Sequence, residues 1–438
     1  MVGAGAAGLA ACRELRRRGV DAVLYEGAAR TGGRCRSGLL GDVVIDRGAA
    51  FIDSHHSVAL ALAEKYQLDV VDLEAAEEPN TRPLFRVSGK AYDWESADRD
   101  FAPLLRAVQR DYRMIQTPRG ADFRAAIDRT SVADYLGSLN ADVSESARSL
   151  MSAALQWEQA ADPGELSALT LLYSLGTSDP DSFSLLGASD TRYTLRRGMQ
   201  SLTDAMTAEL EPWIETNHRL VSASQSPAGV TLIFERTGTA SRTIKADAAI
   251  LATPFSVLRE GVNLTGADLP EPLSRAIAEL GYGRSTKVHI NLRSNPWRGT
   301  TWNGSIIDTD GLQSCWDGGQ ASGTERTVLV NLTAGSGAVD QSLGGDIVAA
   351  RLAAEVASVC NTPVEWAGDC VVDQWHSNEW AKGSYAFFRP GQWTAFGDVV
   401  RSQVGAIRFA GEHTSPFSGG VNGALRSGIR AARDLIDQ

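Results

Sequence analysis

The first eight residues carry glycines whose spacing suits the binding of a dinucleotide. Gly3, Gly5 and Gly8 form the pattern G-x-G-x-x-G, and a helical stretch follows from Leu9 to Arg18. Such glycines permit a tight turn, a close approach of the backbone to a pyrophosphate, and close packing of helix on strand. The N–H groups at the helix N-terminus then face the phosphates with the positive end of the helix dipole.

An acidic residue follows at the spacing that this kind of site uses. The stretch Asp21–Glu26 predicts a strand that ends in an acid, 18 residues after Gly8, where a carboxylate binds a ribose hydroxyl. The motif normally follows an apolar strand, yet only Met1 and Val2 precede Gly3. Either the start is trimmed or the first strand is a stub, and we favour a trimmed start.

A second glycine loop lies just beyond this strand. Gly32 and Gly33 stand between Arg30 and Arg34. The pair suits a loop that wraps a phosphate, with Arg34 supplying charge-assisted hydrogen bonds. Taken alone, the loop is equally typical of a solvated turn. The stretch 43–52 that follows predicts a strand with small residues where another group approaches closely.

The remaining pattern predicts an α/β protein. A continuous apolar run at 247–254 is typical of a buried parallel strand. The other expected elements are helices at 57–68, 131–139, 143–156 and 423–436, a largely helical stretch from 97 to 185, a helix that opens at 196–202, strands at 283–292 and 407–410, and a hairpin formed by 219–223 and 229–234.

Composition excludes several classes of protein. The 438 residues include 42 basic and 53 acidic ones, a net charge of −11, which argues against nucleic-acid or polybasic membrane binding. Only five of the basic residues are lysines. The five cysteines form no CxxC pair or metal-ligand spacing, so we expect reduced thiols, a cytoplasmic location and no metal site. No apolar run approaches the length of a membrane span, and no secretory signal is evident.

The C-terminal block specifies a family. Residues 408–414 (RFAGEHT), 418–424 (SGGVNGA) and 427–428 closely resemble the closing motif of the flavin-containing amine oxidases. The N-terminal glycines, the G-G-R loop, 247–254, 287–297 and 375–391 extend the resemblance over essentially the whole chain. It implies a Rossmann-like FAD-binding domain interwoven with an α+β substrate-binding domain, as in amine oxidases and p-hydroxybenzoate hydroxylase. We expect 1–80, 187–265 and 389–438 in the first domain, and 81–186, largely helical, and 266–388 in the second.

The resemblance implies FAD and a set of residues that bind it. The three N-terminal glycines would meet the pyrophosphate, and Glu26 the adenosine ribose. Arg34, after Gly33, would lie beside the phosphates and the ring. The remaining positions are Val221 at the adenine, Glu412 at the ribityl or pyrophosphate region, and Val421 and Asn422 with the following helix start at the flavin N1–O2 edge.

Two residues match catalytic positions of the family. Lys287 stands where a lysine holds a water against flavin N5, and its ammonium would position water or oxygen for reoxidation. Tyr385 matches one wall of the paired-aromatic cage that guides an amine to the flavin. Where some monoamine oxidases attach the flavin through a cysteine, this chain has Ser384, so non-covalent FAD is predicted.

The substrate positions depart from the family pattern. Gly420 replaces the second aromatic wall, which leaves Phe417 or a tryptophan to fill in and favours a bulkier, less cationic substrate. Phe51 stands where many L-amino-acid oxidases have a carboxylate-binding arginine, which disfavours that activity. Asp53 falls where some polyamine oxidases have an acid at the substrate tunnel, and either attracts a distal amine or is a solvated loop carboxylate.

Three functions follow from these residues. The first is FAD-dependent oxidation of a small-molecule amine to an imine, with O2 as acceptor and release of H2O2. The second is the same chemistry on an amine or amide of a bulky secondary metabolite, which the lost aromatic wall supports. The third is a flavin-holding scaffold that turns over poorly. The sequence does not decide the oligomeric state, and a homodimer is kept as one option.

Overall fold

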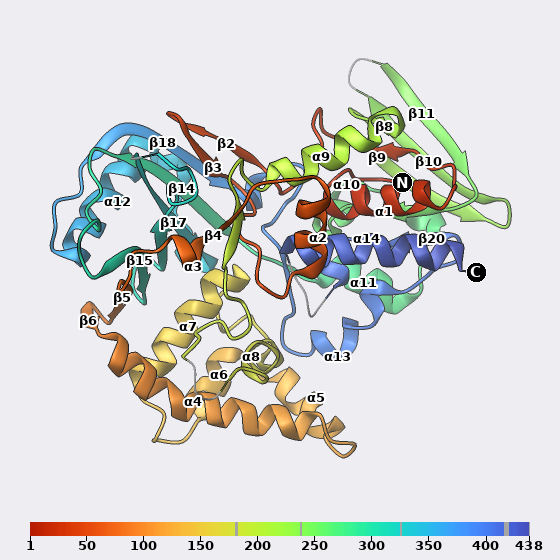
Figure 1. Ribbon diagram of the computed structural model, residues 1–438. Coiled ribbons are helices and arrows are strands. Elements are labelled where there is room, and N and C mark those ends of the chain that lie inside the picture. Colours follow the sequence, from red (N-terminus) through yellow and green to blue (C-terminus); the bar gives the residue numbers. More distant parts are fainter. Residues whose placement is uncertain (180–182, 237–238, 325, 416–419, 438) are drawn as a thin grey trace.

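The computed structural model describes residues 1–179, 183–236, 239–324, 326–415 and 420–437. Figure 1 shows three groups of elements. Helices α1 (Ala6–Arg17) and α14 (Gly420–Ile436) lie beside small parallel sheets near both termini, a larger sheet lies at the opposite side, and helices α4 to α8 lie below the two. Segments far apart in the sequence therefore meet in each group.

The parallel sheet at the termini is completed by one N-terminal residue. Strand β1 (Leu24–Tyr25) pairs with β8 (Ile214–Glu215), and β12 (Ala249–Leu251) with β20 (Ile407–Phe409), all in parallel. Val2 forms parallel bridges to Tyr25 on one side and Leu251 on the other. The strand expected before the glycine motif thus lies between β1 and β12 as a single bridging residue. The strand expected at 21–26 is only two residues long.

Glycine allows the two long helices of this region to lie close to their neighbours. A Cβ on Gly8 would stand 1.8 Å from the carbonyl oxygen of Gly3, and one on Gly428 would stand 2.0 Å from that of Ala7. Helices α1 and α14 are therefore in contact where they pass each other. The third glycine of the motif serves helix–strand packing, as its position predicts.

The predicted hairpin is confirmed and is longer than expected. Strand β9 (Arg219–Ser226) pairs antiparallel with β10 (Gly229–Arg236), and β11 (Thr239–Ala246) adds a third strand. The predicted strand at 43–52 is wrong in its second half. Strand β3 (Val43–Asp46) pairs with β2 (Ser37–Leu40) and then ends, because the segment after it passes close to Arg34: a Cβ on Gly48 would be 1.9 Å from the Arg34 carbonyl oxygen.

A seven-stranded sheet carries the predicted strand at 283–292. Strand β14 (Ser285–Leu292) is buried along its full length. Its even-numbered residues Val288 and Ile290 pack with helix α12 (Gly345–Cys360), so by alternation Lys287 faces the opposite side. The sheet order is β18 (Trp366–Gln374), β14, β17 (Thr327–Ala334), β16 (Ser314–Asp317), β15 (Trp302–Asp308), β5 (Arg82–Val87) and β6 (Lys90–Tyr92).

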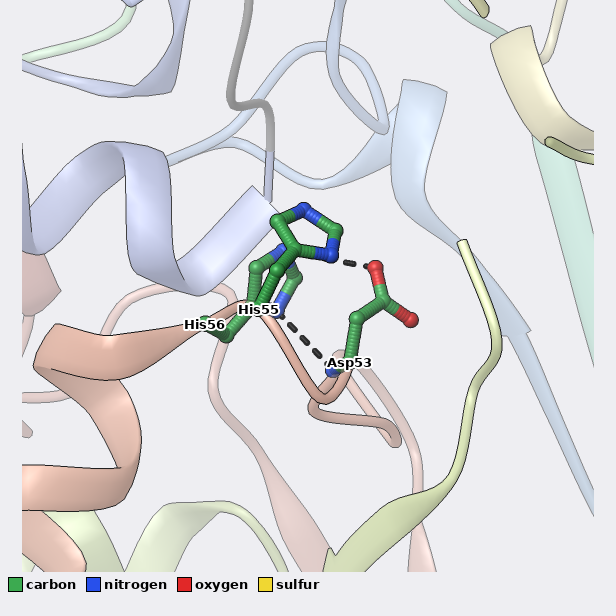
Figure 2. A group of neighbouring side chains, drawn as sticks. All are labelled: Asp53, His55 and His56. Atoms are coloured by element: carbon green, nitrogen blue, oxygen red, sulfur yellow. Dashed lines mark hydrogen bonds and ion pairs between the residues drawn. The ribbon is translucent and has the colours of Figure 1, made fainter. Parts of the chain in front are cut away.

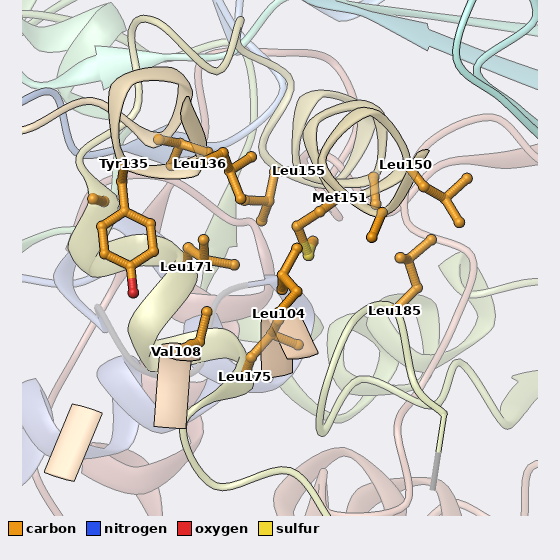
Figure 3. Packing of buried hydrophobic residues seen from close by; sticks show 14 of the residues in the cluster. Leu104, Val108, Tyr135, Leu136, Leu150, Met151, Leu155, Leu171, Leu175 and Leu185 are labelled. Atoms are coloured by element: carbon orange, nitrogen blue, oxygen red, sulfur yellow. The ribbon is translucent and has the colours of Figure 1, made fainter. Parts of the chain in front are cut away.

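The stretch predicted to be helical folds as a bundle around its own apolar core. Figure 3 shows leucines from several helices meeting there, among them Leu104, Leu150 and Leu171, each 1% exposed or less. The predicted helices at 131–139 and 143–156 are confirmed, and Ser131 and Ser144 cap them. The bundle consists of α4 (Trp94–Ile115), α5 (Ala121–Arg129), α6 (Val132–Ser138), α7 (Glu145–Gln159) and α8 (Ala168–Leu175).

The other elements connect these groups. The helix predicted to open at 196 begins only at Gln200. The remaining elements are α2 (Ser57–Lys65), β4 (Val70–Asp72), α3 (Leu73–Ala76), β7 (Tyr193–Leu195), α9 (Gln200–Leu210), α10 (Phe255–Gly261), α11 (Glu271–Glu279), β13 (Gly281–Tyr282), β19 (Ala386–Phe387) and α13 (Gln392–Phe396). The division into two interwoven domains at the bounds given above stays a prediction.

Candidate active site

One large cavity joins the nucleotide motif to the helical bundle. Its volume is about 1300 Å³, and its lining runs from the N-terminal glycine loop to residues of α4, α5 and α8. Twelve of the residues singled out in the sequence line it: Gly3, Gly5, Glu26, Gly33, Arg34, Phe51, Asp53, Lys287, Tyr385, Glu412, Gly420 and Val421.

At the nucleotide end, Glu26 is held in place by the backbone. Its Oε2 accepts a hydrogen bond from Ala4 N at 2.6 Å, and its Oε1 accepts one from Ala28 N at 2.8 Å. Burial raises the pKa of Glu26, and these N–H donors oppose the rise. Each carboxylate oxygen retains a lone pair, so the side chain is oriented to accept ribose hydroxyl protons.

Three predicted cofactor contacts, Gly8, Val221 and Asn422, do not line the cavity, and their place at the cofactor stays a prediction. The Val221 carbonyl accepts from Asn263 N at 2.8 Å, while its neighbours Arg219 and Leu220 line the cavity. The Asn422 Oδ1 accepts from Ala59 N in α2 at 3.2 Å, because the side chain leaves α14 on its buried face.

A partly buried ion pair joins the second glycine loop to the C-terminal block. Arg34 Nη1 donates to Glu412 Oε1 at 2.8 Å and to the Ser384 carbonyl oxygen at 2.6 Å. Burial acts to lower the pKa of Arg34, but Glu412 outweighs it and the pKa is raised. Both residues therefore face the cavity as a charged pair, as expected for groups beside a phosphate-bearing cofactor.

Lys287 is a buried amine at the wall of the cavity. It is 6% exposed, and its Nζ donates to the carbonyl oxygens of Gly48 at 2.5 Å and Asp46 at 3.2 Å. Burial lowers the pKa of Lys287 to about 8, opposed by the charges of Asp46 and Asp373. The ammonium also lies 5.5 Å from the centroid of the Trp316 ring.

Ser384 and Tyr385 are consecutive residues that line the same cavity. The Tyr385 hydroxyl donates to the Trp157 carbonyl oxygen at 3.0 Å, which fixes the ring. Burial, and then the nearby charges of Glu158 and Glu412, raise the pKa of Tyr385, so the phenol is neutral. The Ser384 hydroxyl is 2.6 Å from that of Ser285 and is therefore already paired.

Glu158 is a cavity residue that sequence reasoning missed. It lies near the C-terminal end of α7 and lines the cavity with Asp53 and Tyr385. Burial, and then the charge of Asp53, raise the pKa of Glu158 to about 8. Glu158 belongs to no motif. The one feature of the sequence that could have indicated it is its position on the helix face that also carries the buried residues Leu150, Ala154 and Leu155.

The side chain of Asp53 is held in place by several donors. Its Oδ1 accepts from Thr191 N at 2.8 Å and from Ser189 Oγ at 3.2 Å. Its Oδ2 lies 3.3 Å from His56 Nε2 (Figure 2). The carboxylate is 7% exposed and lines the cavity, so it is not a solvated loop acid.

The neighbouring histidines do not present an open metal site. One donor atom each from Asp53, His55 and His56 lie within 4.8 Å of one another. However, His56 Nδ1 accepts a hydrogen bond from Asp53 N at 3.0 Å, which places the proton of the neutral ring on Nε2, the atom that faces the carboxylate. Metal binding through Nε2 would require that proton to move to the occupied Nδ1. His56 is thus already held by Asp53 through the bond that the Asp53 N–H donates to Nδ1.

The aromatic wall predicted as missing is absent in the described chain. A Cβ on Gly420 would meet no described atom within 4 Å, and the residue has a φ of +64°. Phe417 lies outside the described residues. Phe51 lines the cavity and packs against Trp316, with ring centroids 5.5 Å apart. Among the described residues, no atom occupies the place of a side chain at position 420.

The comparisons with known proteins match this geometry. The family model described as flavin-containing amine oxidoreductase matches residues 6–436. The chain belongs to this family. The family implies a flavin cofactor, and the cavity is the candidate active site for it.

The similarity to known proteins covers nearly the whole chain. A Mycobacterium tuberculosis protein named as a flavin-containing monoamine oxidase is 25% identical over 480 residues, covering 99% of this chain and 95% of that protein. Polyamine oxidase 3 of Oryza sativa is 26% identical over 454 residues, covering 99% and 88%. The structure of putrescine oxidase bound to putrescine superposes with a TM-score of 0.84 at 21% identity, covering 100% and 98%, which shows a shared fold.

The residues at the nucleotide end fit a flavin dinucleotide. A Cβ on Gly8 would displace the backbone of the glycine loop, so only glycine fits at this position. Helix α1 begins beside the loop. The Arg34–Glu412 pair and the oriented Glu26 carboxylate complete a cradle for phosphates and ribose. No helix in the described part of the oxidoreductase is long and apolar enough to cross a membrane.

The paired Ser384 hydroxyl leads to a prediction about flavin attachment. We expect acid precipitation of the purified oxidoreductase to release all yellow colour into the supernatant, because a hydroxyl lacks the nucleophilicity of a thiolate. The absorbance of supernatant and pellet near 450 nm measures this. Ser384→Cys is the informative companion variant, since it restores the thiol that some relatives use. Colour retained in the wild-type pellet would contradict the prediction.

Proposed function

We propose that this oxidoreductase oxidises an amine to an imine with non-covalently bound FAD. The cofactor would accept a hydride equivalent at N5 from the carbon next to the amine nitrogen, and O2 would take both electrons from it to give H2O2. The remaining proton of the amine passes to solvent, and the imine hydrolyses to a carbonyl compound and ammonia or a shorter amine. The substrate therefore loses two electrons and O2 gains two.

The chain's own residues position these reactants. Tyr385, held by its bond to the Trp157 carbonyl, supplies one aromatic face beside which an amine nitrogen can lie. Lys287 brings a buried positive charge to another part of the wall. The start of helix α14, where Gly420 and Val421 line the cavity, supplies N–H groups where negative charge develops.

The observation that carries the proposal is the pair of acids in the substrate part of the cavity. Asp53 and Glu158 line the same cavity as Lys287 and Tyr385, and the charge of Asp53 contributes to the raised pKa of Glu158. Two acids in one cavity favour a cation there, because a positive charge stabilises their ionised forms. This supports a substrate that carries a second ammonium group, as putrescine does in the similar structure.

The test is an anaerobic panel of amines read by flavin bleaching. Diamines and polyamines should bleach the flavin at lower concentrations than monoamines of equal chain length, and readmitted air should restore the colour with one H2O2 per cycle. If photoreduced flavin reoxidises quickly but no amine bleaches it, amine oxidation is contradicted. If neither bleaching nor rapid reoxidation occurs, the flavin-holding scaffold is favoured instead.

Replacing Glu158 with glutamine should remove a pH dependence of diamine binding. In the wild type, Glu158 is neutral below pH 8 and charged above it, so the Kd of a diamine should fall by about tenfold as the pH rises through 8, after correction for the amine's own titration. Glu158→Gln should show no such step. Anaerobic titration followed by flavin absorbance measures the Kd. Glu145→Gln, at the other end of α7, is the matched control, and an unchanged pH step in Glu158→Gln would contradict the assignment.

The alternative of a bulky substrate has support of its own. The cavity extends past Tyr385 between helices of the bundle, where Tyr112, Tyr173 and Trp393 line it. The open space at Gly420 adds room beside the flavin end. The same panel, extended to N-acyl and arylalkyl amines, decides between this alternative and a linear diamine.

A further inference from the structure

The outer end of the cavity is a polar rim on three helices. Tyr112 and Gln116 are one turn apart at the end of α4, and Tyr173 and Thr177 are one turn apart at the end of α8, so each pair shares a face. The rings of Tyr112 and Tyr173 meet edge to face, with centroids 6.4 Å apart. The three exposed lining residues here are Gln116, Arg124 and Thr177. This end is therefore the solvent-facing side of the cavity.

Arg124 is the basic residue of this rim, and its helix gives it no acidic partner. Asp128 lies four residues further along α5, the usual spacing for an ion pair. Its carboxylate is fully buried and already accepts from Ser167 Oγ at 2.7 Å, from Thr394 N at 2.8 Å, and from the Thr394 hydroxyl. The guanidinium of Arg124 lies instead beside the Tyr173 phenol.

Several charged groups of the cavity are paired with acids, whereas Arg124 at the rim is not. Arg30, Arg36 and Lys287 also line the cavity and form no ion pair with a described residue, but they lie away from this rim, on the glycine loop and on β14. Arg34 pairs with Glu412, Arg219 with Glu379, and Lys382 with Glu260. By contrast, Arg124 forms no ion pair with any described residue, although the chain has 53 acidic residues against 42 basic ones. The cavity is thus bipolar, with Asp53 and Glu158 in its inner part and an uncompensated guanidinium at its outer end.

We propose that the substrate carries a carboxylate or similar anion at the end remote from the oxidised amine, and that Arg124, with Gln116 and Thr177, binds this anion at the rim. A guanidinium offers a planar fork of donors that matches a carboxylate in two hydrogen bonds. The amide of Gln116 and the hydroxyl of Thr177 add neutral donors beside it. The inner acids repel an anion, so they favour entry of the substrate with its amine first. The inference rests on the proposed amine oxidation for the end that reacts.

The test compares ω-amino acids of increasing chain length with their carboxamides, as ligands of the flavin-loaded protein. Short amino acids should bind more weakly than their amides, because their carboxylate lies among Asp53 and Glu158. Beyond the length that reaches the rim, the acid should bind at least tenfold more tightly than the amide. Arg124→Gln should reduce this acid-to-amide ratio to near one, and Arg124→Lys should retain part of it. Perturbation of the flavin spectrum under anaerobic conditions reports binding without turnover.

Arg129→Gln is the matched control, since Arg129 is an exposed arginine in the last turn of the same helix and does not line the cavity. This variant should keep the wild-type ratio at every length. A ratio that never exceeds one in the wild type, or that survives Arg124→Gln, would overturn the proposal. Binding that depends on Arg124 without any flavin bleaching would instead refute amine oxidation and leave the anion site intact.

Discussion

Replacing Lys287 with methionine is expected to slow reoxidation of the reduced flavin by on the order of 100-fold, the range seen when one preorganised charge or donor is removed from a reaction centre. Lys287 is 6% exposed and brings a compact positive charge to the cavity wall, where electrons move from flavin to O2 in the proposed function. Methionine keeps the apolar stem and removes the charge and the donors. Mixing the reduced protein with oxygenated buffer in a stopped-flow instrument measures the rate constant.

The same lysine predicts how reoxidation depends on pH. Because burial lowers the pKa of Lys287 to about 8, the side chain is charged below that pH and neutral above it. The wild-type rate constant should therefore fall as the pH rises through about 8, and that of Lys287→Met should stay flat. Lys245→Met, on the exposed side of β11, serves as the control and should behave as the wild type. Equal rate constants and pH profiles for wild type and Lys287→Met would refute the role.

Replacing Arg34 with methionine is expected to lower the free energy of unfolding by about 1.5–3 kcal/mol, the range for hydrogen bonds to a charged group, because the Arg34 side chain is only partly buried. The change leaves the Glu412 carboxylate, 7% exposed, without its guanidinium, and leaves the Ser384 carbonyl without a donor. The flavin should also be lost more readily, because Arg34 lines its end of the cavity. Urea unfolding followed by tryptophan fluorescence measures stability, and gel filtration with absorbance measures retained flavin.

Two further variants distinguish the effect of breaking the Arg34–Glu412 ion pair from a general effect of removing an arginine. Arg293→Met removes an exposed arginine that is 4.0 Å from Glu365, and a surface pair of this kind contributes about 0–1 kcal/mol. In Arg34→Met/Glu412→Gln, the uncompensated charge is gone, so the double variant should be less destabilised than the sum of the single ones. If Arg34→Met lowers the free energy of unfolding by less than about 1 kcal/mol, the attraction within the ion pair does not exceed the cost of removing its charges from water.

The nucleotide end could be predicted because its chemistry is local. Gly3, Gly8 and Glu26 lie within one strand–helix–strand unit, where backbone conformation and close packing allow few residue types. Val221 and Asn422, whose roles come from the family resemblance alone, show the limit of this reasoning. A motif places a backbone position, but the direction of a carbonyl or side chain depends on what packs against it, here Asn263 and helix α2.

By itself, the sequence determined the family, the cofactor loop and the strand that carries Lys287, because each depends on residue types at fixed spacings along one segment. Only the tertiary structure decided which residues meet. Arg34 and Glu412 form their ion pair across 378 residues of sequence, and Glu158, from a helix without a motif, lines the same cavity as Asp53. The bipolar cavity likewise depends on Asp128 being occupied by Thr394, which leaves Arg124 uncompensated. Such long-range contacts follow from packing of whole elements, and no local pattern encodes them.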